Sequence, residues 1–225
     1  MTHRIASALV VLAVALGISA SAEASAIRVS DGSTTQTVTD GSSNDLNFLT
    51  DAVTYSGIIG GWTFNLTLGA AGSDSTDPSL SLSSLNVSSL SGGTFTIMFS
   101  DTGYTSTNTS VLAAIDGATT GSVTYSTYKG TNQFQTSSLL TSEKYTGVFS
   151  DTNTAPLVSA GSYSLTQVVT IKQGILGSTW FNASLDAVGG TRTVSVPDGG
   201  STAMSLGIAL LGLAALKRRF PALLK

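Results

Sequence analysis

Carboxylates are the side chains in this sequence that could carry acid–base chemistry. Glycoside hydrolysis needs only two of them, placed on either side of the scissile bond. Most of the acidic residues stand beside Gly, Ser or Thr, where an Asp side chain caps the backbone of a turn. Asp101, between Phe99 and Tyr104, is the one acid whose apolar, aromatic neighbours would raise its pKa. Turn capping is the favoured role for the set as a whole. Its members are Asp31, Asp40, Asp45, Asp51, Asp74, Asp77, Asp101, Asp116, Glu143, Asp151 and Asp186.

The residues most often used for metal binding and proton transfer are scarce. The chain has no Cys and a single His, His3, which lies in an N-terminal segment that we expect to be removed. A domain without Cys and His lacks disulfides, thiolate nucleophiles, the commonest general base and the commonest zinc ligands. We therefore expect no catalytic residues, no enzyme activity and no cofactor.

One loop could hold a hard cation. The stretch GSDSTDP at 72–78 places Asp74 and Asp77 close together, and loop carboxylates of exported β proteins suit calcium. The stretch lacks the alternating acids and the bidentate Glu of a dedicated calcium loop. A polar turn closed by Pro78 is the favoured interpretation, and a structural Ca²⁺ at Asp74 and Asp77 is the alternative.

Aromatic side chains could bind carbohydrate, because an exposed ring stacks on the face of a sugar. Trp62 alternates with Phe64 and Leu66, which places it in the core rather than on the surface. The candidates for a sugar-binding platform are Tyr104, Tyr128 and Trp180.

Charge is scarce, and acidic residues dominate it. Charged residues make up 10% of the chain, far below the usual ~25%. Residues 27–195 hold five basic side chains against eleven acidic ones. A phosphate-binding surface needs clustered Lys and Arg. We therefore expect no nucleic-acid partner and no attraction of the body for a polyanion.

The body of the chain alternates apolar and polar residues with a period of two, as half-buried strands do. The stretch GGWTFNLTLG places Trp62, Phe64, Leu66 and Leu68 on one face, and GGTFTIMFSD repeats the pattern. Clusters of Gly, Asn, Asp and Ser between such runs are typical of antiparallel sandwiches and barrels. The pattern predicts an all-β body over 25–195, an antiparallel β-sandwich (jelly-roll-like or Greek-key) of about eight to ten strands.

Two short segments could form single turns of helix, namely 111–118 and the residues around Leu139. Irregular loops are predicted at 69–78, at 101–110 and near 150–161.

The N-terminal residues have the pattern of a signal peptide over 1–24. Arg4 supplies a positive start, residues 5–18 are apolar, and Ala22 and Ala24 form a small-x-small cleavage site. We predict cleavage after Ala24, which exports the chain.

The C-terminal residues have the pattern of a membrane anchor. Residues 201–216 are uncharged and largely apolar, and as a transmembrane helix they reach about 24 Å, marginal for a ~30 Å hydrocarbon core. Pro221 would end the helix. A basic cluster stays on the cytoplasmic side, which leaves the body outside. This cluster is Lys217, Arg218 and Arg219.

A short motif precedes the anchor. Pro197 keeps Val196 extended, and two glycines keep the backbone thin and mobile, so a protease could draw the segment into a cleft as a strand. The motif is Val196, Pro197, Asp198, Gly199 and Gly200.

A Pro-containing motif, an apolar helix and a basic cluster over 196–225 resemble the PEP-CTERM sorting signal, here in its Val-Pro-Asp variant. The resemblance implies recognition in the inner membrane by an exosortase, a transpeptidase-like protease that removes the anchor. It also implies release to the envelope surface or the extracellular space, and a role in an extracellular polysaccharide matrix or biofilm.

We therefore expect an exported protein of the cell envelope or extracellular matrix, with a structural or adhesive role and a transient anchor. The low charge and the hydroxyl-rich composition favour that role. A carbohydrate-binding β-sandwich module is the first alternative, and extracellular polysaccharide is then the expected partner. A carboxylate-dependent glycoside hydrolase is the second.

Overall fold

The computed structural model describes residues 25–71, 78–105, 107–158 and 161–189. Within these ranges the chain forms ten β-strands and no helix, which confirms the predicted all-β class. The strands are β1 (Ala26–Ser30), β2 (Thr35–Thr39), β3 (Ala52–Ile59), β4 (Trp62–Ala71), β5 (Ser79–Ser89), β6 (Gly93–Tyr104), β7 (Ser110–Gly130), β8 (Ser138–Pro156), β9 (Tyr163–Gln173) and β10 (Gly177–Val188).

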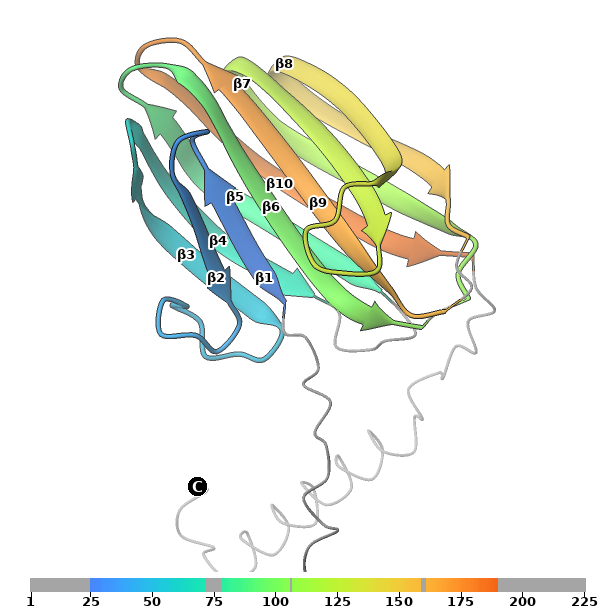
Figure 1. Cartoon of the computed structure of the whole chain (residues 1–225). Helices are drawn as coiled ribbons and strands as arrows, with labels where there is room; N and C mark the ends of the chain where they lie inside the picture. The colour runs from blue at the N-terminus through green and yellow to red at the C-terminus, as the bar shows by residue number, and fades with distance from the viewer. Residues whose placement is uncertain (1–24, 72–77, 106, 159–160, 190–225) are drawn as a thin grey trace, which may run out of the picture. The chain divides into compact units, whose positions relative to one another are not determined.

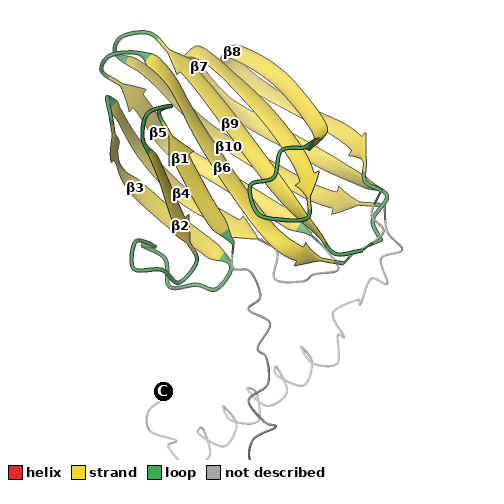
Figure 2. Ribbon diagram, in the orientation of Figure 1, coloured by secondary structure: helices red, strands yellow, loops and turns green. Residues whose placement is uncertain are grey.

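The strands pack as two antiparallel layers that share one long hairpin (Figure 1). Sheet A consists of β2, β1, β6, β9 and residues 122–130 of β7, and sheet B consists of β3, β4, β5, β10 and residues 110–119 of β7. β8 pairs with both halves of β7 and so borders both sheets. Figure 2 shows the layers face to face, with loops at the strand ends.

β7 passes from one sheet to the other at residues 119–122, where its register with β8 shifts. Gly121 makes this crossing possible, because a Cβ at this position would lie 2.0 Å from the backbone oxygen of Lys172. Polar side chains hold the crossing together. The hydroxyls of Thr119 and Thr179 lie 2.7 Å apart, and Nε2 of Gln173 donates to the Thr119 hydroxyl at 2.9 Å.

The core lies between the two sheets and is built from the inward side of each alternating strand. Trp62 of β4 stacks on Phe95 of β6 with ring centroids 5.3 Å apart, and Phe64 contacts the same ring at 5.2 Å. These contacts join sheet B to sheet A. Trp62, Phe64 and Leu66 are buried, as the alternation predicts, and so are Phe95, Ile97 and Phe99.

Both helical predictions are wrong. Residues 111–118 belong to β7 and the residues around Leu139 to β8. Val111, Ala113 and Ile115 point inward with a period of two, while Leu112 and Ala114 between them lie on the outer face. Pairing with β10 on one side and β8 on the other satisfies the backbone of this segment.

The loops are shorter than predicted. β4 continues to Ala71, β6 to Tyr104 and β8 to Pro156, so strand residues occupy part of each expected loop.

Candidate functional site

Several residues singled out in the sequence lie outside the described residues. These are the cleavage-site alanines Ala22 and Ala24, the calcium candidates Asp74 and Asp77, the motif Val196–Gly200, and the basic cluster Lys217, Arg218 and Arg219. Over the part of the chain that the structure describes, no helix is long and apolar enough to span a membrane. The described residues also contain no group of three or more acidic or histidine side chains that could hold a metal ion.

The three aromatic candidates for sugar binding lie at separate places. Tyr104, at the end of β6, is 2% exposed and contacts Tyr163, with ring centroids 5.8 Å apart. It therefore presents no ring face to solvent, and its selection as a platform was wrong. Tyr128 is half-buried on the outer face of sheet A, opposite Thr166. Trp180 lies on the outer face of sheet B and is 45% exposed.

Trp180 is exposed because β10 alternates, with Thr179 and Phe181 buried on either side of it. Its register partner on β7 is Ala118, and Val148 follows on β8 with 85% exposure. Trp180, Ala118 and Val148 thus form a row of apolar residues across three adjacent strands. The result is an apolar patch beside the polar side chains of β10 and β5.

Gly117 allows the strands to approach closely next to Trp180. A Cβ at this position would lie 2.3 Å from the backbone oxygen of Trp180 and 2.8 Å from Cζ of Phe149. The close approach lets Phe149 pack beneath β7 from the inner side, where Phe149 is buried. Gly117 therefore allows β7 and β10 to lie close together at the point where β10 carries Trp180.

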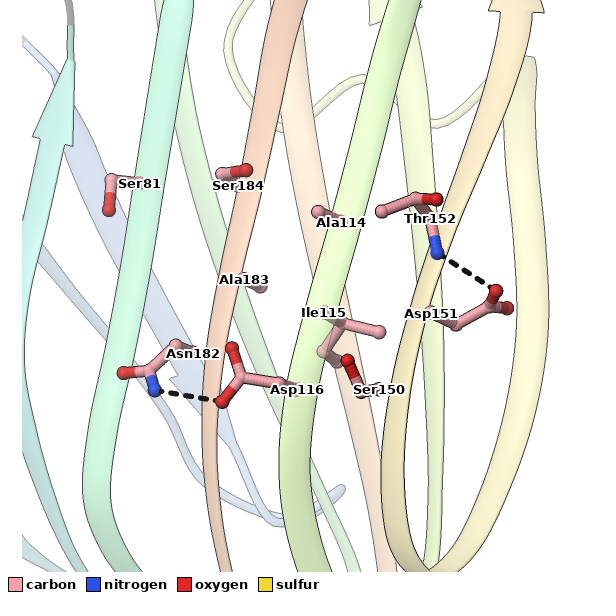
Figure 3. Close-up of a pocket in the computed structure, with 10 residues that line it drawn as sticks. All are labelled: Ser81, Ala114, Ile115, Asp116, Ser150, Asp151, Thr152, Asn182, Ala183 and Ser184. Atoms are coloured by element: carbon pink, nitrogen blue, oxygen red, sulfur yellow. Dashed lines mark hydrogen bonds between the residues drawn. The ribbon is translucent and has the colours of Figure 1, made fainter.

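A shallow depression lined by both polar and apolar residues lies two residues along the same face (Figure 3). Nδ2 of Asn182 on β10 donates to Oδ2 of Asp116 on β7 at 3.2 Å, and the two residues are register partners. Ser184 and Ser81 continue the polar surface along β10 and β5. Figure 3 shows the side chains of Asn182 and Asp116 turned toward each other. Residues two apart on a strand are about 7 Å apart, so the ring of Trp180 and the Asp116–Asn182 pair fit under neighbouring parts of one ligand.

Asp151 borders the depression, but its side chain forms hydrogen bonds within β8. Its side chain accepts hydrogen bonds from the Tyr145 hydroxyl at 3.0 Å, from Nδ2 of Asn153 at 3.1 Å and from its neighbour Thr152 N at 2.8 Å. Tyr145 precedes and Asp151 follows Gly147, which has a φ of 66° where β8 turns from sheet A to sheet B. The Tyr145–Asp151 bond therefore fixes this bend.

Other acids cap turns, as the sequence predicts. Oδ1 of Asp31 accepts from the amides of Ser33 and Thr34, and these bonds hold the pKa of Asp31 below its usual value, with the bond from Thr34 contributing most. Asp45 accepts from the amides of Gly41, Asn47 and Thr54 within a second depression in the β2–β3 loop. These oxygens are occupied by the backbone.

Asp101 is buried, as its aromatic neighbours in the sequence predict. It is 7% exposed, and burial raises the pKa of its carboxyl. It faces the interior at the end of β6, opposite Leu165 of β9. It does not line the depression beside Trp180.

Comparison with known proteins gives one family match. Residues 195–220 match the VPDSG-CTERM motif, a PEP-CTERM-like C-terminal sorting signal. The match confirms the Val-Pro-Asp variant of the signal and supports an exported, envelope-associated protein. No curated protein matches the chain.

Several solved structures resemble the chain only distantly. One is the cleaved adhesin domain of Lys-gingipain from Porphyromonas gingivalis, with 14% identity over 66% of this chain and 97% of that one, and a TM-score of 0.35. TmCBM61 in complex with β-1,4-galactotriose has 9% identity over 55% and 86%, and a TM-score of 0.31. Carbohydrate-binding module CBM36 in complex with calcium and xylotriose has 14% identity over 44% and 76%, and a TM-score of 0.28. At these TM-scores no ligand or activity carries over to this chain.

Proposed function

We propose that the protein is an exported, non-enzymatic component of the cell envelope or extracellular matrix, structural or adhesive in role, and that its sandwich binds carbohydrate. The binding surface is the outer face of sheet B around Trp180. The adhesive role and the carbohydrate-binding module are then one function, because a matrix protein adheres through the polysaccharide it holds.

The observation that carries the proposal is the exposed indole of Trp180 on the same strand face as a hydrogen-bonded Asp–Asn pair. A sugar has an apolar face, which stacks on an aromatic ring, and a rim of hydroxyls, which need hydrogen-bond partners. Carboxylate oxygens accept from those hydroxyls, and an Asn amide both donates and accepts. Binding sites combine an apolar platform with a few placed polar groups in this way.

The charge of the face sets the class of saccharide. Its strands carry Asp116 and Asp186, and no basic residue stands at the described outward positions of sheet B. Acidic groups repel uronate or sulfate, so the ligand of this face is an uncharged polysaccharide.

The sorting signal gives the proposed route. An exosortase-like enzyme of the inner membrane reads the motif at 196–200, removes the anchor and releases the body. Intact mass spectrometry on protein from the native host tests this step, with and without the exosortase-like gene. A mature form starting near Ser25 and ending between Pro197 and Gly200 is expected only when the gene is present. A membrane-bound form ending at Lys225 in both strains contradicts the route.

Affinity electrophoresis of the full-length protein in gels containing dextran, galactan or xylan tests carbohydrate binding. We expect at least one of these uncharged polysaccharides to retard the wild-type chain. Trp180→Ala should weaken that binding about fivefold or more, the equivalent of one lost stacking contact. Tyr128→Ala, on the opposite sheet, is the matched control and should bind as the wild type does. Equal retardation of Trp180→Ala and wild type, or no retardation in any gel, contradicts the proposal.

A further inference from the structure

The basic side chains of the sandwich are unevenly distributed. Five positions carry Lys or Arg between 27 and 195, and four of these lie in the described residues. Three of the four, Arg28 on β1, Lys172 on β9 and Lys144 on β8, stand at outward positions of sheet A or its β8 border. The fourth, Lys129, pairs with inward-facing Leu165 and donates to the backbone oxygen of Val158 at the end of the sandwich.

The same face lacks acidic side chains. The described outward positions of β1, β2, β6, β9 and the second half of β7 hold Ser, Thr, Met, Val and Tyr beside the cations. Lys144 and Lys172 are exposed, and neither forms an ion pair with a described residue. At the described outward positions of sheet A all the charge is therefore positive, whereas Glu143, exposed next to Lys144 on β8, stands at an inward register position opposite Tyr125.

The cations are close enough to act together. Lys172 is the register partner of Ser122, and Lys144 is the partner of Thr124, two residues further along β7. With strands about 4.8 Å apart and about 3.4 Å per residue, the two lysines lie about 12 Å apart. This is close to the Debye length of ~10 Å at 0.1 M salt, so their fields overlap on a bound polymer.

Arg28 is held in place on this face. Its guanidinium lies 4.0 Å from the ring centroid of Phe134, and its Nε donates to the Thr37 hydroxyl at 3.2 Å. Phe134 belongs to the β7–β8 loop, and its amide donates to the Ser100 hydroxyl at 3.0 Å, which ties the loop to the outer face of β6. The positive charge is therefore preorganised rather than free to move away.

Hydroxyl rows cross the face between the cations. Thr96, Thr170 and Thr124 are register partners on three adjacent strands, and Lys144 ends the row on β8. Tyr128 stands on the same face, opposite Thr166. Hydroxyls donate to and accept from sugar hydroxyls, and the phenol ring offers a stacking surface.

We propose that the outer face of sheet A binds an anionic polysaccharide, with Lys144, Lys172 and Arg28 pairing with its carboxylate or sulfate groups and the threonine rows contacting its hydroxyls. The site goes beyond the uncharged-polysaccharide face and lies on the opposite layer of the sandwich. A domain with both faces cross-links two kinds of polymer in a matrix. The acidic net charge of the body alone predicts no binding of a polyanion. Binding becomes favourable because the basic residues gather on the outer face of sheet A, away from most of the acidic ones.

The test is affinity electrophoresis of the full-length protein in gels containing alginate, a polyuronate, at 50 mM and 300 mM NaCl. We expect retardation at the lower salt concentration that falls steeply at the higher one, because exposed ion pairs are screened. Lys144→Gln/Lys172→Gln should weaken alginate binding by about twofold to fivefold for each exposed ion pair, and so by up to roughly 25-fold together. Lys129→Gln changes the net charge at an inward-facing position and should bind alginate as the wild type does. Thermal unfolding of each variant checks that the fold is kept.

Two further variants distinguish this face from the face around Trp180. Tyr128→Ala should weaken alginate binding and leave binding of uncharged polysaccharide intact. Trp180→Ala should weaken binding of uncharged polysaccharide and leave alginate binding intact. Absence of alginate retardation in the wild type, or equal retardation of the double variant, overturns the proposal and leaves the face around Trp180 untouched. Sedimentation of the wild type should give a monomer. An oligomer that the double variant dissociates would make sheet A an interface between copies of this chain, and would also overturn it.

Discussion

The hydroxyl of Tyr125 on β7 lies 2.8 Å from the backbone oxygen of Ser184 on β10 and 2.8 Å from Oε1 of Gln167 on β9. β9 belongs to sheet A and β10 to sheet B, so a single phenol joins the two layers. The ring is 3% exposed and Gln167 is fully buried. Each binding face is the outer side of one layer, and this contact keeps the layers in register with each other.

Tyr125→Phe should destabilise the sandwich by about 1–2 kcal/mol, because it removes the hydroxyl and leaves buried acceptors unpaired. The midpoint of thermal unfolding should fall by roughly 3–8 °C for a domain of this size. Differential scanning calorimetry measures the change. Tyr128→Phe removes a hydroxyl at a half-buried outward position and should leave the midpoint within about 1 °C. Equal effects of the two variants would contradict the role of Tyr125.

Buried tyrosines predict a loss of stability in alkali. Burial raises the pKa of Tyr125 well above 10.0, and burial beside Asp101 raises the pKa of Tyr104. The contribution of these two tyrosines to the stability of the fold is complete below pH 10, where they are protonated in the unfolded chain as well. It is lost as the pH rises toward their pKa values in the folded state. The part of the tyrosinate absorbance at 295 nm that comes from Tyr104 and Tyr125 should therefore appear only together with unfolding. Gradual ionisation of every tyrosine in the folded state would contradict the burial of these two.

Asp101→Asn should stabilise the protein at pH 7. Burial raises the pKa of Asp101, so the folded state resists ionisation of this side chain, while the unfolded state ionises it above its ordinary value of 3.8. The folded state loses stability as the pH rises from this ordinary pKa toward the raised pKa of the folded state. An uncharged Asn avoids this loss. Urea unfolding at pH 7 should show a higher midpoint for the variant, and the difference should vanish below pH 3.8. A variant less stable than wild type at pH 7 would contradict this assignment.

Gly117→Ala should destabilise the chain by about 1–3 kcal/mol, since the added methyl meets the backbone of β10 and the Phe149 ring. It should also weaken binding of uncharged polysaccharide, because the added methyl meets the backbone oxygen of Trp180 and displaces this residue. Gly174→Ala is the matched control, because a Cβ there meets nothing within 4 Å. Urea unfolding and affinity electrophoresis of the two variants measure both effects. Equal stability of the two variants would show that β7 and β10 do not need this close approach.

The alternation of residue types predicts the fold class and much of the core. Phe95, Ile97 and Phe99 follow the pattern and are buried. The pattern fails over residues 111–118, because three of the four outward positions hold Leu112, Ala114 and Ala118, and Asp116 alone marks a polar side with a period of two. Ala118 is the register partner of Trp180 on one side and of Val148 on the other, which only the tertiary pairing shows.

The candidate sites could be predicted only in part. The sequence identifies Trp180 as a candidate but gives no sign that Asp116, far away in the chain, is hydrogen-bonded to Asn182. The prediction of an exposed Tyr104 is wrong, because its neighbours in the sequence do not show that the ring turns inward against Tyr163. Counting charged residues along the sequence does not reveal the positive face of sheet A. Its residues Arg28, Lys144 and Lys172 are far apart in sequence and are brought together by strand pairing.

The most direct measurement follows the two tryptophan side chains by NMR, using the indole N–H signals of the full-length protein. The chain has two tryptophans, of which Trp62 is buried in the core and Trp180 is exposed on sheet B. The spectrum of Trp180→Ala assigns the signals. Titration with an uncharged polysaccharide that retards the protein should shift the Trp180 signal and leave the Trp62 signal in place. A bound protein with both indole signals unchanged would contradict the proposed carbohydrate-binding face.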